Sequence, residues 1–543
     1  MTSKNGSSTN GYSPNTLASR TGGDVVCDAI LEAGVDVVFG MPGGASLPFY
    51  DALYRYQDRL RHVQIRHEQA AGFAANGYAR ATGKVGVATS TSGPGATNMV
   101  TCMANDMMDS VGVVYITGQV ARPVIGSDAF QETDITGISI PITKHSYLVL
   151  DVDDLPRVMK EAFHLAASGR PGPVHVDIPK DIFLESTTEV APRDLNLRGY
   201  QPPKVGNRTM VRRAADVINA SERPVIMAGH GIDISGASDE LFELATCGNI
   251  PVVSTLHGVG TFPETHPLSF GMLGMHGSYE ANNAMHDCDL MINIGARFDD
   301  RITGKIDEFS PKSKKVHIDI DPSSINKNVK VNLPIVGDVS KVISSTIKTI
   351  KKVKPSFAKS NKQKISKWWE RIEKWRSINS FDFVNSTETI KPQYAVQRLY
   401  ELTKNKDTYI TTEVGQHQMW AAQHYKFDKP NRWMTSGGLG TMGYGLPAAV
   451  GVQVAHPRKL VIDIAGEASV LMTMQEMSTA VQYSLPIKIF ILNNEYMGMV
   501  RQWQELLHDK NYSESYTAAL PDFVKLAEAY GCVGIRATKP EEL

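Results

Sequence analysis

Apolar runs that end in glycine, proline or small polar residues recur along this chain and constrain its fold strongly. In the first third they are VDVVFGMPGG (35–44), KVGVATSTSGPG (84–95), VGVVYITG (111–118) and GPVHVDIP (172–179). Near-continuous apolar strands are typical of parallel sheets that are buried on both faces. In such sheets ligands bind beside the carboxyl ends of the strands. The pattern therefore predicts a doubly wound domain whose ligand-bearing loops contain these glycines.

The same alternation of apolar runs and helical segments returns in two further blocks. RPVIMAGHGI (223–232) and DLMINIGARFDDR (289–301) belong to the second block, and KLVIDIAGEAS (459–469) and PIKIFILNNEY (486–496) to the third. Because 543 residues exceed one ordinary domain, the fold class we predict is α/β, with three doubly wound parallel-sheet domains. The predicted boundaries are a disordered tail over 1–20, domains over 21–190, 205–350 and 391–543, and a linker over 351–390.

Composition restricts the partners and the compartment. The 56 Lys and Arg nearly balance the 57 Asp and Glu, so the net charge of −1 gives no reason to expect nucleic acid or a membrane as partner. No apolar run reaches the roughly 18 residues that a membrane span needs. Five cysteines, an odd number without a CxxC, favour a reducing compartment. The polar first twenty residues fit a disordered tail better than a transit peptide. We expect a cytoplasmic protein, with an organellar location as the alternative.

A segment rich in Lys and Trp, residues 351–376, allows two interpretations. Basic residues interleaved with aromatics occur in nucleic-acid-binding surfaces. The protein as a whole is not basic, however, so we favour a solvated amphipathic helix that links the second and third domains.

The segment 466–498 contains the most informative residues. An apolar strand runs into a turn bearing Glu467, and a helix and a second strand then lead to Asn493 and Asn494. Adjacent parallel strands would place Glu467 and Asn494 side by side at their carboxyl ends. Oxygen ligands there suit Mg²⁺ with a diphosphate completing its shell. The alternative is that both residues are ordinary turn formers.

This segment resembles the thiamine-diphosphate motif, which begins Gly-Asp-Gly and ends Asn-Asn. The resemblance implies Glu467, Asn494 and the backbone carbonyl of Tyr496 as metal ligands. It implies that Gly466, Ala468 and Ser469 bind the cofactor. The chain departs from the motif with Glu467 in place of Asp and Ala468 in place of the second Gly, which leaves an oxygen ligand but lengthens its side chain.

Two further segments resemble the same enzyme class. RHEQAAGFAANGYAR (66–80) matches its glutamate segment, which implies that Glu68 hydrogen-bonds the aminopyrimidine ring and helps to remove the thiazolium proton. TSGGLGTMGYGLPAA (435–449) matches the loop in which the carbonyl of Gly440 accepts from the pyrimidine amine and Met442 bends the cofactor. Upstream, Gln416 and His417 match residues that hold the diphosphate.

Two stretches resemble the acetohydroxyacid synthase family within this class: LGMHGSYEAN (273–282) and IGARFDDRITGK (294–305). In that family they lie along a bound FAD with a mainly structural role. The residues that the resemblance assigns to FAD are Arg170, Gly274, His276, Gly295, Arg297, Asp319 and Asp338. For Asp319, Asp321 and Asp338, the alternative is that they form turns at strand ends.

The substrate residues also follow from this resemblance. Arg301 is the expected clamp on the carboxylate of the second ketoacid, because a guanidinium binds a carboxylate through two hydrogen bonds. Trp503 is the expected apolar wall that favours a larger acceptor. The catalytic and substrate positions that the family places around the reacting carbon are Gly44, Phe130, Gln131, Lys180 and Met275.

The resemblance implies an acetolactate synthase reaction. Pyruvate would be decarboxylated and its two-carbon unit joined to pyruvate or 2-ketobutyrate, the first common step of branched-chain amino acid biosynthesis. The cofactor would lie between the first domain of one copy and the third domain of another, which implies a homodimer or homotetramer. The resemblance allows a small regulatory subunit as a further partner. The chain stops at ATKPEEL, where relatives continue, so we expect a missing C-terminal arm. A pyruvate-oxidase-like flavoenzyme and a non-catalytic relative remain as alternatives.

Overall fold

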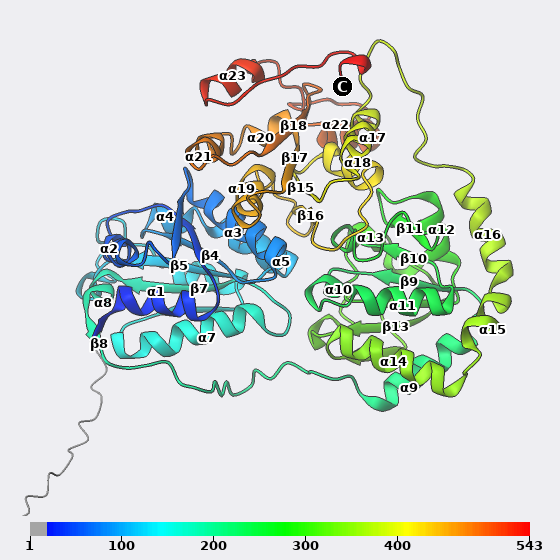
Figure 1. The fold of residues 1–543 in the computed structure, drawn as a ribbon, viewed down its shortest axis with the longest axis horizontal. Coiled ribbons are helices and arrows are strands. Elements are labelled where there is room, and N and C mark those ends of the chain that lie inside the picture. Colours follow the sequence, from blue (N-terminus) through cyan, green and yellow to red (C-terminus); the bar gives the residue numbers. More distant parts are fainter. Residues whose placement is uncertain (1–18) are drawn as a thin grey trace, which may run out of the picture.

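The computed structural model describes residues 19–543, so the predicted tail over 1–20 lies outside the described residues except for its last two. Three parallel sheets divide the chain (Figure 1), which confirms the predicted fold class. The first domain, blue to cyan, and the central domain, green, lie beside one another, and the third domain, orange to red, lies across both. A long segment without helices or strands leads from the first domain to the central one.

The first domain contains a six-stranded sheet of order β3-β2-β4-β5-β7-β6. Its strands are β2 (Val37–Gly40), β3 (Arg61–Gln64), β4 (Gly86–Ser90), β5 (Val113–Gln119), β6 (His145–Leu148) and β7 (Val174–Pro179). Its main helices are α1 (Gly22–Glu32), α2 (Leu47–Arg55), α3 (Glu68–Thr82), α5 (Val100–Asp109), α7 (Leu155–Ala167) and α8 (Lys180–Leu184). The chain leaves β2 in one direction and β4 in the other, so a crevice opens between the carboxyl ends of these two strands.

The central sheet has the order β11-β10-β9-β12-β13-β14. Its strands are β9 (Pro224–Ala228), β10 (Val252–Ser254), β11 (Ser269–Met272), β12 (Leu290–Ile294), β13 (Lys314–Asp319) and β14 (Leu333–Val336). Helices α9 (Arg208–Ala220), α10 (Gly231–Ile234), α11 (Ser238–Gly248), α12 (Tyr279–Asp287) and α14 (Val339–Val353) accompany it. Renumbered from β9, this is the 3-2-1-4-5-6 order of dinucleotide-binding domains, whose ligand lies between the first and fourth strands.

The third sheet has the order β16-β15-β17-β18. Its strands are β15 (Thr408–Thr412), β16 (Trp433–Met434), β17 (Leu460–Gly466) and β18 (Lys488–Leu492). Helices α17 (Pro392–Thr403), α18 (Gln416–His424), α19 (Gly445–Ala455), α20 (Glu467–Val470), α21 (Glu476–Gln482), α22 (Gly498–Leu507) and α23 (Phe523–Ala529) accompany it. The order matches the first four strands of the first domain, and here the crevice lies between β15 and β17.

The Lys- and Trp-rich segment differs from the predicted solvated helix. It forms two helices, α15 (Phe357–Lys364) and α16 (Ser366–Arg376). Trp368 is 2% exposed and packs in a core cluster of the central domain, where its indole N–H donates to the Pro224 carbonyl at 3.2 Å. The tryptophans therefore cover the central domain. Most lysines of the segment are exposed, but Lys364 is half-buried and donates to the Asn219 carbonyl at 2.7 Å.

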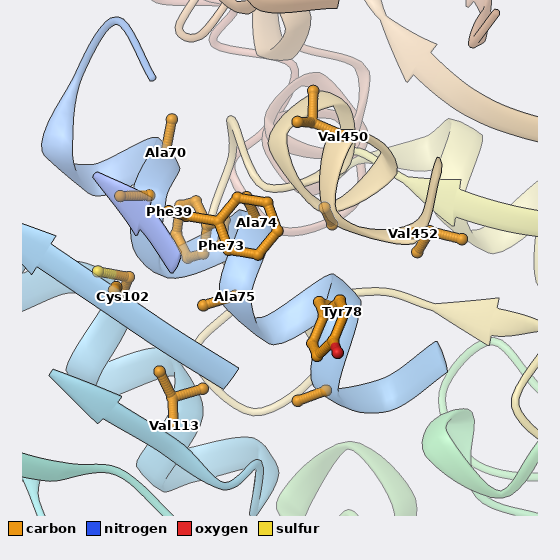
Figure 2. Close-up of a cluster of buried hydrophobic side chains, with 14 of the residues drawn as sticks. Phe39, Ala70, Phe73, Ala74, Ala75, Tyr78, Cys102, Val113, Val450 and Val452 are labelled. Atoms are coloured by element: carbon orange, nitrogen blue, oxygen red, sulfur yellow. The ribbon is translucent and has the colours of Figure 1, made fainter. Parts of the chain in front are cut away.

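Helices α3 and α19 join the first and third domains (Figure 2). Phe73, Ala74 and Tyr78 of α3 share a buried cluster with Val450 and Val452 of α19. Small residues allow the two backbones to approach closely. A Cβ atom at Gly77 would lie 2.2 Å from the Ala448 carbonyl oxygen, and one at Gly451 only 1.8 Å from that of Ala74.

In the part of the chain that the structure describes, no helix is both long and apolar enough to cross a membrane. All five cysteines are free thiols.

Candidate active site

A small cavity of about 60 Å³ lies at the carboxyl ends of β15, β17 and β18. Nine of the predicted cofactor and metal residues line it: Gln416, His417, Met442, Gly466, Glu467, Ala468, Ser469, Asn494 and Tyr496. They come from loops far apart in sequence, and the order of the sheet brings them together.

Glu467 and Asn494 lie side by side, as adjacent parallel strands require. Gly466, which precedes Glu467, pairs with Leu492, two residues before Asn494, and the Asn494 N–H lies 3.5 Å from Oε2 of Glu467. Glu495 adopts a left-handed φ of 63°, and the Tyr496 N–H donates to Oδ1 of Asn494 at 3.2 Å. This turn keeps Tyr496 beside the pair.

One oxygen of the Glu467 carboxylate lacks a partner. The residue is 2% exposed, and within the described residues its Oε1 accepts no hydrogen bond. Burial raises the pKa of this carboxyl. A buried carboxylate oxygen without a donor is costly unless a cation or a ligand satisfies it. No cluster of three His, Cys, Asp or Glu side chains suited to a metal occurs in residues 19–543, so a metal here would need the amide and carbonyl oxygens that follow β18.

His417 lies under the same cavity between two glycines. A Cβ atom at Gly415 would lie 2.6 Å from its ring, and one at Gly466 would also lie 2.6 Å away. Burial lowers the pKa of His417 to about 4, so the ring is neutral at physiological pH. Its Nε2 is buried and has no hydrogen-bond partner among the described residues. A neutral imidazole N–H is a suitable donor to a diphosphate oxygen.

The structure adds a residue that the sequence analysis missed. Glu413 is fully buried directly after β15 and accepts the Gly443 N–H at 2.7 Å, the Leu446 N–H at 3.1 Å and the Ser469 hydroxyl at 2.7 Å. Gly443 follows Met442, and Ser469 belongs to the Glu467 turn. A single carboxylate thus fixes the two loops that line the small cavity.

A buried Asp463 lies on β17 near Glu413. Burial, and then the charge of Glu413, raise the pKa of Asp463 well above its usual range. Glu413 accepts three hydrogen bonds and is therefore the better place for the negative charge, while Asp463 holds a proton.

A large cavity of about 1250 Å³ opens at the β9–β12 crevice of the central domain. The predicted FAD and substrate residues that line it are Arg170, His276, Gly295, Arg297, Asp319, Asp338, Met275, Arg301 and Trp503. Gly440 also lines it, so this cavity extends to the glycine loop of the third domain. Gly274 does not line the cavity. Its φ of 101° and a Cβ position 2.5 Å from the Arg301 carbonyl oxygen indicate that it shapes the turn before Met275.

Glycines let the chain segments that follow β9 and β12 pack closely at this crevice. A Cβ atom at Gly229 would lie 2.3 Å from the Gly295 carbonyl oxygen, and one at Gly231 2.8 Å from the Gly295 Cα. The segments after β9 and β12 therefore contact each other through backbone atoms, without side chains between them. Dinucleotide pyrophosphates bind against backbone of this kind at a topological switch point.

The expected acceptor residues meet at the edge of the large cavity. The Arg301 guanidinium lies 5.1 Å from the ring of Trp503, a cation–π distance, and 3.9 Å from the Met275 sulfur. Trp503 is half-buried on α22 and faces this cavity, so it is not a core residue.

The first domain gathers a separate group of predicted residues. Asn98 donates to Oε2 of Glu68 at 3.0 Å, and a Cβ atom at Gly95 would lie 3.3 Å from Oε1. The Thr91 hydroxyl accepts the N–H of Ala45, next to Gly44, at 3.1 Å. Nearby, Gln131 has a φ of 60°, and its carbonyl lies against Gly93. These loops follow β2, β4 and β5.

Lys180 and Phe130 are exposed on the same domain. Lys180 begins α8 directly after β7, and Phe130 is 89% exposed. Neither they nor Glu68, Gly44 and Gln131 line the two cavities. Within one chain, the predicted catalytic glutamate and the predicted metal site are therefore not brought together.

The structure defines a three-domain α/β protein whose two cavities lie at the carboxyl ends of parallel strands, where such sheets bind phosphorylated cofactors. Three domain models of thiamine pyrophosphate enzymes match the chain: the N-terminal TPP-binding domain over residues 20–138, the central domain over 211–346 and the C-terminal TPP-binding domain over 413–543.

The relatives narrow this class. The chain is 48% identical to the acetolactate synthase isozyme 3 large subunit of Escherichia coli, over 96% of this chain and 91% of the relative. It is 45% identical to the acetolactate synthase large subunit of Haemophilus influenzae, with the same coverage, and 47% identical to acetolactate synthase of Mycobacterium bovis, over 97% and 85%. The chain belongs to the thiamine pyrophosphate enzymes and, within them, to the acetolactate synthase family.

Proposed function

We propose that this chain is a catalytic acetolactate synthase that decarboxylates pyruvate and joins the two-carbon unit to a second 2-ketoacid. The observation that carries this proposal is the near full-length similarity to acetolactate synthases, together with a carboxylate–amide pair at the small cavity. Pyruvate gives 2-acetolactate, and 2-ketobutyrate gives 2-aceto-2-hydroxybutyrate.

Thiamine diphosphate and Mg²⁺ fit the small cavity. The partnerless Oε1 of Glu467 suits a cation, and the neutral His417 with its free ring nitrogen suits a diphosphate oxygen. Gln416, Gly466, Ala468 and Ser469 would complete the diphosphate cradle. Asn494 and the Tyr496 carbonyl would supply the other metal ligands. When bound, the cofactor supplies the carbon nucleophile and accepts the electrons released as CO₂ leaves.

Glu68 would hold a proton at the ring nitrogen of the cofactor. It begins α3, its Oε2 is oriented by Asn98, and its other oxygen faces the gap beside Gly95. From the third domain, the Gly440 carbonyl would accept a hydrogen bond from the pyrimidine amine. Met442 would hold the cofactor in its bent shape.

FAD fits the large cavity, whose volume exceeds the roughly 300–1,000 Å³ of ordinary ligand sites. The close backbone of Gly231 and Gly295 would receive the pyrophosphate, and Arg170 and Arg297 would face its charge. Asp319 and Asp338, at strand ends beside the cavity, suit ribose hydroxyls.

The functional unit that we propose contains at least two copies of the chain. Glu68, Gly44, Gln131, Lys180 and Phe130 lie at the carboxyl end of the first sheet, outside both cavities of their own chain. A second copy would present its third domain to them, in a homodimer or homotetramer, and a small regulatory subunit is compatible with this arrangement.

The acceptor would be held by Arg301 and Trp503. The guanidinium binds the carboxylate of the ketoacid, and the indole ring excludes water beside its alkyl group. Met275 adds apolar surface on the same side.

The direct test is an assay of purified protein with pyruvate, measuring acetolactate with all three cofactors and with each one omitted. We expect acetolactate that requires thiamine diphosphate and Mg²⁺. Anaerobic bleaching of the flavin by pyruvate, with acetate or acetyl phosphate as product, would instead indicate a pyruvate oxidase. Absence of any product with all cofactors bound would indicate a non-catalytic relative.

A further inference from the structure

A buried polar cluster lies where the three domains meet. Arg80 of α3 and Asp109 of α5 come from the first domain, and His257 follows β10 in the central domain. The third domain contributes Gly437 and Gly438, in the loop between β16 and α19. The Asp109 side chain is completely buried. None of these residues was singled out by the sequence.

The hydrogen-bond directions in this cluster follow from the chemistry of its members. Arg80 has only donors, and its guanidinium lies 3.1 Å from Nδ1 of His257, so this nitrogen accepts. The other ring nitrogen lies 2.9 Å from Oδ1 of Asp109. The imidazole thus lies between a guanidinium and a carboxylate, and its Nε2 makes no hydrogen bond within the described residues although Oδ1 of Asp109 is close.

Asp109 holds the glycine loop through its backbone. The Gly438 N–H donates to Oδ1 at 2.6 Å and the Gly437 N–H to Oδ2 at 3.2 Å. Burial alone would raise the pKa of Asp109, but His257, Arg80 and the Gly438 N–H outweigh it and lower the pKa to about 2. The loop therefore rests on a permanent negative charge.

Only glycine fits at positions 437 and 438, because the loop backbone packs directly against Asp109 and His257. A Cβ atom at Gly437 would lie 2.4 Å from Nε2 of His257. One at Gly438 would lie 2.8 Å from Oδ1 of Asp109 and 3.2 Å from the Arg297 guanidinium. The loop backbone is thus in direct contact with residues that line the large cavity.

The same loop continues to Met442, which lines the small cavity proposed for thiamine diphosphate. Asp109, His257, Gly437, Gly438 and Gly440 all line the large cavity. Gly440 is only two residues beyond Gly438, and its carbonyl is the proposed acceptor from the pyrimidine. The loop from Gly437 to Met442 therefore runs from the large cavity to the small one.

We propose that Asp109 and His257 are positioning residues that couple occupancy of the large cavity by a flavin dinucleotide to the geometry of the Gly437–Gly440 loop. The inference rests on the proposed function, because it assumes both cofactor sites. Coupling of this kind is reciprocal: each cofactor strengthens binding of the other by the same factor. It gives the flavin a role without electron transfer.

The test is a double titration of the cofactor-free protein. The dissociation constant of FAD is measured by quenching of flavin fluorescence, with and without thiamine diphosphate and Mg²⁺. That of thiamine diphosphate is measured with and without FAD. For the unaltered protein we expect each cofactor to tighten the other by at least about fivefold, the lower end of typical coupling.

Asp109→Asn should bring this factor close to one, because an amide has a single acceptor oxygen and leaves one loop N–H unpaired. His257→Gln, checked for folding by circular dichroism, tests the same link if Asp109→Asn does not fold. Arg170→Gln is the matched control. Arg170 lines the cavity and pairs with Asp321 and the Ser110 hydroxyl rather than with the glycine loop, so the variant should weaken FAD binding and keep the coupling factor.

The outcomes separate the inference from the proposed function. The inference is wrong, and the proposed function stands, if both cofactors bind the unaltered protein independently. The same holds if Asp109→Asn and His257→Gln leave unchanged the factor by which each cofactor tightens the other. If neither cofactor binds the unaltered protein, the proposed function itself is wrong.

Discussion

Gly451 lies in the middle of α19. For the substitution Gly451→Ala, helix propensity predicts a more stable protein and packing predicts a less stable one. In an isolated helix, Gly→Ala is stabilising by about 1 kcal/mol. Here the new Cβ would lie 1.8 Å from the Ala74 carbonyl oxygen of α3. The obstacle is backbone on both sides, so the two helices must separate by more than 1 Å to restore a normal contact of roughly 3.4 Å.

Overpacking costs about 1–3 kcal/mol and occasionally more. Because the new Cβ meets fixed backbone at 1.8 Å, we expect a cost at the upper end of this range, which exceeds the gain in propensity. Gly451→Ala should therefore lower the free energy of unfolding and the midpoint of thermal unfolding by several degrees. Activity should fall as well, since α3 begins with Glu68 and α19 follows the Gly437–Gly440 loop.

The measurement is thermal unfolding followed by circular dichroism, with acetolactate production measured in parallel. Gly248→Ala is the matched control. It is also a helical glycine, but the new Cβ meets side-chain atoms of Ile250, Cδ1 at 2.7 Å and Cγ1 at 2.8 Å, rather than backbone. A midpoint for Gly451→Ala equal to or above that of the parent protein would refute the packing argument.

Three further predictions concern the proposed site. Glu68→Gln should keep cofactor affinity, measured by titration, while lowering turnover by about 10²-fold or more, as expected for loss of a general acid–base group; near-normal turnover would contradict its role. Trp503→Leu should lower the ratio of acetohydroxybutyrate to acetolactate, because an apolar wall is worth about 1–3 kcal/mol in discrimination; an unchanged ratio with a collapsed rate would make it structural. Glu467→Ala should lose Mg²⁺ and diphosphate affinity together, and full activity of the parent protein after exhaustive chelation would exclude Glu467 as a ligand.

The sequence predicted best what depends on local pattern and strand order. Apolar runs ending in glycine marked the parallel strands, and the rule that parallel strands end at one edge placed Glu467 beside Asn494, where the structure has them. The large cavity likewise collects residues that were predicted from three separate segments.

What the sequence could not predict depends on contacts between distant segments. Glu413 looked like any acidic residue after a strand, and its three donors come from two later loops. Asp109 and His257 contact each other and the glycine loop only because three domains meet there, and a sequence pattern does not show such contacts. The segment containing α16 was predicted as a solvated amphipathic linker, because an amphipathic pattern does not reveal which domain the apolar face of the helix covers.

The central claim is that acetolactate is made at a site shared by two copies of the chain, and complementation tests it most directly. Chains carrying Glu68→Gln and chains carrying Glu467→Ala are produced together with different affinity tags, and the mixed dimers are isolated through both tags. Each variant alone should be nearly inactive. In a mixed dimer, one site combines both defects and the other pairs an intact Glu68 with an intact Glu467. The shared-site account therefore predicts about half the activity of the unaltered dimer. Mixed dimers as inactive as the separate variants would contradict it.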